Sequence, residues 1–203
     1  MRKIITLLLV AALLIPNFAV AQRAETESAT PETVTRAEFA RVVVRMYNDE
    51  IELGQLETRF VDISDHWAYE YIRFLEQRGI IRGDGYGYFR PDDVITLQET
   101  VTMLTRALGY QPMANSNGGF PVGYMIAGVT AGVTIDVGSV SLTELVTRDL
   151  ARTLVNNALD APFMQRRVRG APPLRESFLD TAWYGYDVYF DGENFMIGDY
   201  KNE

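Results

Sequence analysis

The stretch FVDISDHWAYEYIRFLEQRGIIRGDGYGYFRPDDVITLQETVTMLTRALGY, from Phe60 to Tyr110, decides the fold of this chain. Parts of the same pattern occur on both sides of it. The piece TRAEFARVVVRMYN precedes it at Thr35–Asn48, while FPVGYMIAGVTAGV at Phe120–Val133 and TRDLARTLVNNALD at Thr147–Asp160 follow it. Internal repetition predicts an array of one small unit, whose copies bury their apolar faces against each other and bind ligands in the grooves between them.

The first residues have the pattern of a secretion signal. Arg2 and Lys3 give a basic start, residues 4–16 are almost wholly apolar, and the segment NFAVA ends in Ala-x-Ala at Ala21. The apolar run is shorter than the about 20 residues of a membrane-spanning helix, so we expect residues 1–21 to be a cleaved signal peptide. Residues 22–32 read as a polar, flexible lead-in. We expect a secreted protein that has no membrane partner after cleavage.

The composition narrows the classes of function. The chain has 0 Cys, so its stability must come from a packed core and not from disulfides. Its formal net charge is −8, and loss of Arg2 and Lys3 with the leader makes it −10. Such an acidic chain is not expected to bind nucleic acid, and an anionic ligand would need local basic groups. Apart from Lys3 and Lys201 every cationic residue is arginine, which suits carboxylate recognition, but codon bias explains it better because the arginines are spread along the whole chain.

Capping motifs and apolar spacing predict a mainly helical fold. Thr35 with Glu38, and Thr96 with Glu99, have the spacing of a capping box at a helix start. Thr147 opens a further helix with an incomplete box, because Leu150 stands at the third helical position. Two more helices are expected at His66–Gln77, ending at Gly79, and at Val122–Val133. The segments expected to be loops are Arg82–Arg90, which is rich in glycine, and Gln111–Gly119.

The last part of the chain differs in composition. A basic, proline-containing connector follows Pro162, and Ser177–Tyr200 is rich in aromatic residues. The strand-like segments DVYF and NFMI flank Asp191–Gly192, which predicts a β-hairpin. A lone hairpin is marginally stable in water, so it should either pack on the helices or begin a further domain.

Several motifs together resemble the S-layer homology domain. They are Thr-Arg-Ala-Glu at Thr35–Glu38, Phe60-x-Asp62, His66-Trp67-Ala68, Gly79-Ile80-Ile81-x-Gly83 and Gly87-x-Phe89-x-Pro91. The resemblance covers residues 33–162. It implies a pseudo-threefold spindle of three helix–loop–helix units: 33–59, which lacks its head, 60–111, and 112–162, which is degenerate. Residues 163–203 form the aromatic tail. The missing head of the first unit is supplied either by another segment, such as the tail, or by a permuted spindle.

The resemblance also implies a function. Domains of this family bind secondary cell wall polysaccharide, typically through a pyruvylated sugar, in the grooves between units. This chain would then be a non-enzymatic, cofactor-free anchor on a bacterial cell wall. Arg36 and Arg148 match the arginine of the family motif, at a helix start whose free N–H groups and dipole favour an anion. In the second unit Leu97 stands where the motif has arginine, so we do not expect the groove of that unit to bind an acidic sugar well.

Four other residues complete the candidate binding site. Glu38 belongs to the same motif as Arg36, and Gly79 and Gly83 would let the backbone approach the ligand. Trp67 matches the family tryptophan. It has two interpretations: stacking on a sugar ring, or packing in the core as part of an apolar helix stripe, and the stripe favours packing.

Other functions were weighed against the wall anchor. One alternative keeps the fold with decayed sugar grooves and binds a protein partner through the aromatic tail. A second is a wall hydrolase using acids such as Glu70 or Glu144, although no motif marks a pair. With His66 as the single histidine and no cysteine, we expect no metal site of the zinc type. Asp84, Asp92 and Asp93 suit turns better than a calcium loop.

Overall fold

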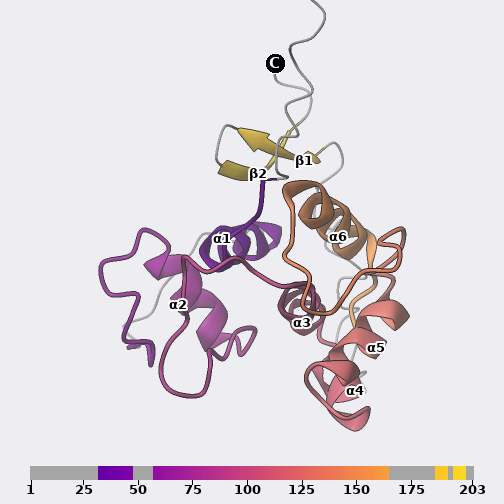
Figure 1. The fold of residues 1–203 in the computed structure, drawn as a ribbon, viewed down its shortest axis with the longest axis horizontal. Helices are drawn as coiled ribbons and strands as arrows, with labels where there is room; N and C mark the ends of the chain where they lie inside the picture. The colour runs from indigo at the N-terminus through magenta and orange to yellow at the C-terminus, as the bar shows by residue number, and fades with distance from the viewer. Residues whose placement is uncertain (1–31, 48–56, 165–185, 192–193, 200–203) are drawn as a thin grey trace, which may run out of the picture. The chain divides into compact units, whose positions relative to one another are not determined.

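The computed structural model of the protein describes residues 32–47, 57–164, 186–191 and 194–199. Within them it has the mainly helical architecture that the sequence predicts, and Figure 1 shows the arrangement. The helices are α1 (Arg36–Met46), α2 (Tyr69–Gln77), α3 (Leu97–Ala107), α4 (Gln111–Ser116), α5 (Val122–Ala131) and α6 (Arg148–Asp160). The predicted signal peptide, most of the lead-in and the connector after Pro162 lie outside the described residues, apart from Phe163 and Met164.

Threonine caps start α1, α3 and α6, as the sequence predicts. Thr35 and Thr96 are extended, and each forms a complete capping box with the glutamate three residues on. Thr147 accepts a hydrogen bond from the Leu150 N–H, and the box is incomplete there because leucine cannot bond back. Each cap satisfies N–H groups that a helix start leaves without an intrahelical partner.

The residues just before these caps join the three helix starts. The Val34 N–H donates to the Val146 carbonyl, and the Val146 N–H donates to the Ile95 carbonyl. The Ile95 N–H donates back to the Val34 carbonyl, and each of the three bonds is 2.9 Å long. These bonds close a ring among segments far apart in the sequence. All three residues are buried, so the ring lies in the core and fixes how α1, α3 and α6 begin relative to one another.

The helix predicted at His66–Gln77 begins three residues late, at Tyr69. The His66 ring Nδ1 accepts the Ala68 N–H at 3.1 Å, so the side chain holds a turn where a helix was expected. The C-terminal end follows the prediction. Gly79 is left-handed (φ +68°) and the Ile80 N–H reaches back to the Leu75 carbonyl at 2.9 Å, which is the bond of a Schellman cap.

The loop predicted at Gln111–Gly119 is wrong in its first part, which forms the short helix α4. Pro112 lies in the first turn, where its fixed φ suits a helix and its missing N–H costs nothing. The next helix, α5, is confirmed. Its small residues allow close approach: a methyl group at Gly123 would stand 2.1 Å from the Ala114 carbonyl oxygen.

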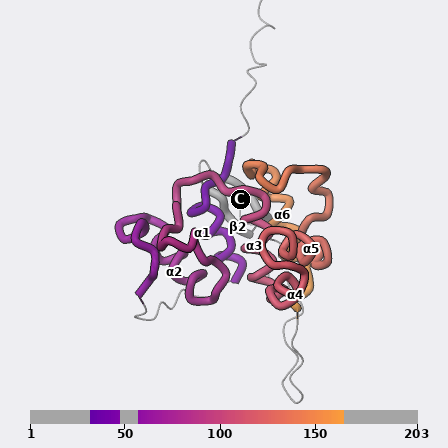
Figure 2. The backbone as a smooth tube through the Cα atoms, turned by 60° about the horizontal axis from the view of Figure 1, so that its bottom comes forward, coloured from indigo at the N-terminus to yellow at the C-terminus, as the bar shows by residue number. Residues whose placement is uncertain are grey.

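The helices pack in two neighbouring groups around one core. Figures 1 and 2 both show α2 beside α1, and α5 beside α3 and α4, in agreement with the contacts between these elements. Large side chains such as Phe39, Ile72, Leu104 and Tyr124 are almost wholly buried at these contacts. Burial of apolar surface of this kind is the main stabilising term of the fold.

In the tail, two strands are described. β1 (Tyr186–Asp191) pairs antiparallel with β2 (Asn194–Asp199), with Val188 opposite Ile197. In the part of the chain that is described, no helix has the length and apolar character that crossing a bilayer requires.

Candidate functional site

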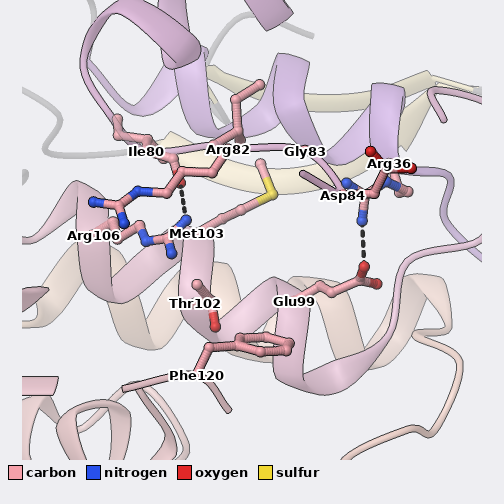
Figure 3. Close-up of a pocket in the computed structure, with 11 residues that line it drawn as sticks. Arg36, Ile80, Arg82, Gly83, Asp84, Glu99, Thr102, Met103, Arg106 and Phe120 are labelled. Atoms are coloured by element: carbon pink, nitrogen blue, oxygen red, sulfur yellow. Dashed lines mark hydrogen bonds and ion pairs between the residues drawn. The ribbon is translucent and has the colours of Figure 1, made fainter. Parts of the chain in front are cut away.

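A groove of about 460 Å³ lies between the start of α1, the length of α3 and the segment that follows α2 (Figure 3). Its charged lining residues are Arg36, Arg82, Asp84, Glu99 and Arg106, and its other lining residues are Ile80, Ile81, Gly83, Thr102, Met103 and Phe120. A smaller cavity of about 240 Å³ shares Arg36, Gly83, Asp84 and Glu99 with it. The two hollows therefore meet at Arg36.

Arg36 is held in place from three sides. Its Nε donates to the Phe89 carbonyl at 2.8 Å, and its guanidinium carbon lies 4.7 Å from the centre of the Phe89 ring. Its Nη1 forms an ion pair with Glu99 (Figure 3). The side chain is 15 % exposed, so the guanidinium is oriented before any ligand arrives.

The backbone at the start of α1 does not offer free donors to an anion, contrary to the expectation from the sequence. The Arg36 N–H donates to the Asp93 carbonyl and the Ala37 N–H to the Pro91 carbonyl, both at 2.9 Å. The Glu38 N–H donates to Thr35 Oγ1 at 3.2 Å. At this helix start the Arg36 side chain is therefore the group that an anion could reach.

Glu99 connects the groove to the cap of α3. Its Oε2 accepts the Thr96 N–H at 3.0 Å and the Thr96 hydroxyl at 2.7 Å, while Oε1 meets Arg36. The carboxylate thus orients the arginine and also competes with any anionic ligand for it.

Arg106 forms the opposite end of the groove. Its Nε donates to the Tyr124 hydroxyl and its Nη1 to the Ile80 carbonyl, each at 3.0 Å. Its guanidinium carbon lies 4.7 Å from the Tyr124 ring centre. These contacts join α3 to α5 and to the segment after α2, so Arg106 is a rigid positive charge in the lining.

The glycine-rich loop is fixed by Asp84. Its Oδ1 accepts the N–H groups of Tyr86 (2.8 Å) and Tyr88 (3.2 Å), and Oδ2 accepts from Arg90 at 2.8 Å. The Tyr86 N–H is the largest of the contacts that hold the pKa of Asp84 below its ordinary value, followed by the Tyr88 N–H and Arg90. The carboxylate is thereby stabilised in its charged form.

The lining of the groove is locally basic although the protein is acidic. Three arginines face two carboxylates in the lining, whereas the whole chain has a formal charge of −8. Arginine forks match carboxylate and phosphate oxygens. The groove is therefore the kind of surface on which an acidic protein binds an anionic ligand.

The residues predicted to form the binding site do not all line the same groove. Arg36 and Gly83 line the groove, whereas Gly79, Glu38 and Arg148 are not among its lining residues. Gly79 ends α2, and Glu38 Oε2 accepts the Thr35 N–H at 2.7 Å within the α1 capping box. Arg148 occupies at the start of α6 the position that Arg36 occupies at the start of α1.

Gly83 is required by the protein's own packing. Its φ is +67°, and a methyl group there would stand 2.4 Å from Phe60 Cε1 and 2.7 Å from the Tyr88 carbonyl oxygen. The conformation and the close approach both exclude a side chain. This glycine therefore shapes the groove wall, whatever it does toward a ligand.

The interpretation of Trp67 as a core residue is wrong, because Trp67 is 52 % exposed. It lies before α2 and not on its buried stripe, with the Arg41 guanidinium 5.0 Å from its ring centre. Phe120 stands at the same place before α5, two residues ahead of the helix, and is 53 % exposed. Phe120 lines the Arg36 groove. Trp67 stands at the equivalent position of the preceding repeat, beside α1, and is therefore the counterpart of Phe120.

Sequence reasoning missed Arg82, Arg106 and Phe120. Arg82 lies inside the recognised Gly79–Gly83 motif, so the motif itself held that signal. Arg106 is the tenth residue of α3, and Arg45 is the tenth of α1, so position within the repeat indicated it as well. Nothing in the sequence near Phe120 distinguishes a half-exposed ring from a buried one.

The groove's charges have uncharged counterparts one repeat further along. Positions are counted from the starts of α3 and α6 and from the left-handed glycines Gly79 and Gly132. The counterparts of Arg36, Arg82, Asp84, Glu99 and Arg106 are Leu97, Ile135, Val137, Leu150 and Asn157. The register is supported by hydrogen bonds, since Arg106 donates to the Ile80 carbonyl and Asn157 to the Val133 carbonyl, each directly after a left-handed glycine. The groove position that begins at Leu97, called the middle position, thus lacks all five charged residues that line the Arg36 groove.

Two of the three acids considered for calcium, Asp84 and Asp92, have protein partners. Asp84 is bound as described, and Asp92 Oδ1 lies 3.1 Å from His66 Nε2. Over the described residues, no three histidine or acidic side chains gather as a metal site would require. The turn chemistry expected for Asp84 is confirmed by its bonds to Tyr86 and Tyr88.

The family comparison converges on the same segment. The sequence model of the S-layer homology domain matches residues 59–101, which contain the loop at the groove and the first turns of α3 with Glu99. The chain is 37 % identical over 84 residues to a surface layer protein of Brevibacillus choshinensis, covering 40 % of this chain and 8 % of that protein. It is 36 % identical over 89 residues to the middle cell wall protein of Brevibacillus brevis, covering 42 % and 8 %.

A cellulosome-anchoring protein of Acetivibrio thermocellus is 36 % identical over 85 residues, covering 40 % of this chain and 19 % of that protein. The chain thus spans less than a fifth of the length of each of these three relatives. The likeness is to one part of each relative. The part of this chain for which a family is matched is residues 59–101, which are similar to the S-layer homology domain.

Proposed function

We propose that this chain is a non-enzymatic module that attaches to a bacterial cell wall by binding an anionic wall polysaccharide in the Arg36 groove. The observation that carries the proposal is the coincidence of the S-layer homology match with a groove lined by three arginines in an acidic protein. The named relatives, a surface layer protein, a cell wall protein and a cellulosome-anchoring protein, support a place at the cell surface.

Within the groove, Arg36 is the proposed contact for the ligand's carboxylate, such as that of a pyruvylated sugar. Its side chain is oriented by Phe89 and Glu99, and a carboxylate would take over the partner role of Glu99. Arg82 and Arg106 add positive charge along the same wall. A saccharide ring beside that carboxylate would meet the half-exposed ring of Phe120.

A second groove is proposed at the start of α6. There Arg148 is the counterpart of Arg36, and Glu38, Arg45 and Trp67 are the counterparts of Glu99, Arg106 and Phe120. The closed ring Val34–Ile95–Val146 supports the three-unit arrangement that this pairing needs. We propose Gly79 and Gly83 as structural supports of these grooves, and the aromatic tail as a site for a protein partner.

The hydrolase alternative has little support in the groove. Of the acids that line it, Asp84 accepts from Arg90 and from two N–H groups, which hold its pKa below its ordinary value. Glu99 is occupied by Arg36 and by the cap of α3. A glycosidase needs two carboxyl groups that flank the scissile bond. The alternative with decayed grooves is favoured for the middle position alone, where Leu97 and Leu150 replace the ion pair.

The test is co-sedimentation of the full chain with purified cell wall sacculi. Half of the sacculi are stripped of secondary polymer by acid, and the Arg36→Ala variant is run beside Arg152→Ala, which removes an arginine from α6 outside the groove. We expect binding to intact sacculi only, clearly weakened in Arg36→Ala and kept in Arg152→Ala. Equal binding by both variants would reject the groove, and no binding to intact sacculi would reject the anchor.

A further inference from the structure

The charges of the Arg36 groove are unevenly distributed along its length. Glu99 forms its ion pair with Arg36 at one end, and Asp84 lines the smaller cavity together with Arg36 at that same end. Figure 3 shows the side chains of Arg82 and Arg106 toward the other end, away from this ion pair. That end, called the Arg82 end below, has two arginines and no carboxylate among the described lining residues.

Arg82 differs from the other two arginines of the groove. The guanidinium groups of Arg36 and Arg106 both donate hydrogen bonds to the protein, as described above. Arg82 is exposed, and no described residue forms a hydrogen bond or an ion pair with its side chain. Its guanidinium donors can therefore all bind a ligand, without the loss of an internal contact.

The two carboxylates of the lining do not neutralise Arg82, because both have other partners. Asp84 accepts two N–H groups of the glycine-rich loop and forms an ion pair with Arg90 at 2.8 Å. Glu99 is bound to Arg36 and to the cap of α3. The positive charge of the groove is therefore concentrated at the Arg82 end, and a cleft lined by one sign of charge attracts the opposite sign.

We propose that the Arg82 end is a second anion subsite, so that the groove binds a saccharide segment with two oxyanion groups. The inference rests on the proposed function, in which Arg36 binds the first group. The second group is a carboxylate or a phosphate, because a guanidinium fork matches the oxygens of both. Arg82 binds it directly, and Arg106, which its hydrogen bonds hold in place, adds a second positive charge.

The groove has room for such a segment. Its volume of about 460 Å³ lies within the range of about 300–1,000 Å³ that is typical of small-molecule sites. Figure 3 shows Met103 between the two charged ends, and the half-exposed ring of Phe120 lines the same groove. Apolar side chains between two cationic ends suit a sugar ring whose acidic groups point in opposite directions. A polymer with a single acidic group per segment would leave Arg82 unpaired, so this end favours a more densely charged polymer.

The experiment measures binding isotherms of the full chain on intact sacculi for the wild type, Arg82→Gln, Arg36→Ala and the double variant. Glutamine can still form hydrogen bonds but has no charge. Arg59→Gln is the matched control, because it removes the same charge from an exposed arginine outside the groove, which pairs with Glu76. Circular dichroism melting shows whether each variant is folded.

We expect Arg82→Gln to weaken binding about two- to fivefold, the value of an exposed ion pair, and Arg59→Gln to bind as the wild type does. The loss should be the same in the Arg36→Ala background, because contacts to two separate groups add. Sacculi whose carboxylates are blocked as amides identify the second group. The difference between Arg82→Gln and the wild type then disappears if the group is a carboxylate and persists if it is a phosphate.

Three results are distinguishable in the same set of isotherms. Equal binding by Arg82→Gln and Arg59→Gln, with Arg36→Ala weakened, overturns the second subsite and leaves the proposed function standing. An effect of Arg82→Gln that vanishes in the Arg36→Ala background also overturns it, because the two arginines would then share one anionic group. Wild-type binding by Arg36→Ala rejects the proposed function and this inference with it.

Discussion

Arg36 and Glu99 form an ion pair across the groove, and the same carboxylate caps α3 through Thr96. The residue that holds the arginine proposed to bind the ligand is thus also its resident anion. An incoming carboxylate would have to displace or share this partner, so in the proposed site Glu99 would set both the geometry and the affinity.

Replacing Glu99 by glutamine should strengthen binding to anionic wall polymer. The amide oxygen can still accept the Thr96 N–H, while the charge that competes for Arg36 is removed. An exposed ion pair is worth up to about 1 kcal/mol, so we expect a gain of about two- to fivefold in affinity. Binding isotherms on intact sacculi measure it. Weaker binding with unchanged melting would mean that Glu99 acts mainly by positioning Arg36.

Replacing Arg36 should weaken wall binding far more than it weakens the fold. Loss of a charge-assisted contact to a carboxylate costs about 1.5–3 kcal/mol, which is about 10- to 150-fold in affinity. Arg36→Lys keeps the charge but lacks the fork, so it should recover only part of the binding. Full recovery of wall binding in Arg36→Lys would show that charge alone matters. If binding is lost only to the extent that the variant unfolds, Arg36 has a structural role and not a binding role.

The caps and periodic apolar positions made most of the helical fold predictable, because both are local signals. Thr35 and Thr96 mark helix starts in the sequence as clearly as in the structure. The groove was less predictable, since Arg106, Arg82 and Phe120 meet Arg36 only after the chain segments come together. Periodicity placed Trp67 on the helix stripe because it does not register the turn that His66 holds before the helix.

The exposure of Trp67 changes what its removal should cost. A buried aromatic loses about 3–5 kcal/mol on truncation, but Trp67 is half-exposed and contacts the Arg41 guanidinium and the rings of His66 and Tyr71, contacts worth about 0.5–1.5 kcal/mol each. Trp67→Ala should therefore shift urea unfolding less than truncation of a buried ring. Phe74→Ala is the control, because Phe74 in α2 is 2 % exposed and should show the large loss. Similar losses in the two variants would restore the core assignment of Trp67.

Asp84 should make part of the stability depend on acid pH. Its folded-state pKa lies below its ordinary value of 3.8, chiefly through the Tyr86 N–H. The stabilisation is therefore present above about pH 4 and is lost as the pH falls from 3.8 through the lower folded-state pKa. Asp84→Asn should be less stable near pH 6, with a smaller further loss between pH 5 and about pH 3. Parallel melting curves at all pH values would contradict this role.

Alanine variants at Gly83 and Gly85 distinguish the stability cost of backbone strain from that of steric collision within one loop. Both have positive φ, +67° and +89°, so alanine costs about 1–2 kcal/mol at either position. Only at Gly83 does the new methyl group also meet Phe60 and the Tyr88 carbonyl, whereas nothing lies within 4 Å at Gly85. Overpacking adds about 1–3 kcal/mol, so Gly83→Ala should unfold at clearly lower urea concentration than Gly85→Ala.

Because Gly83 also forms the groove wall, its variant should lose wall binding even at temperatures where it remains folded, while Gly85→Ala keeps it. Equal stability of the two variants would mean that Phe60 moves aside at little cost and that the groove wall is softer than its contacts indicate.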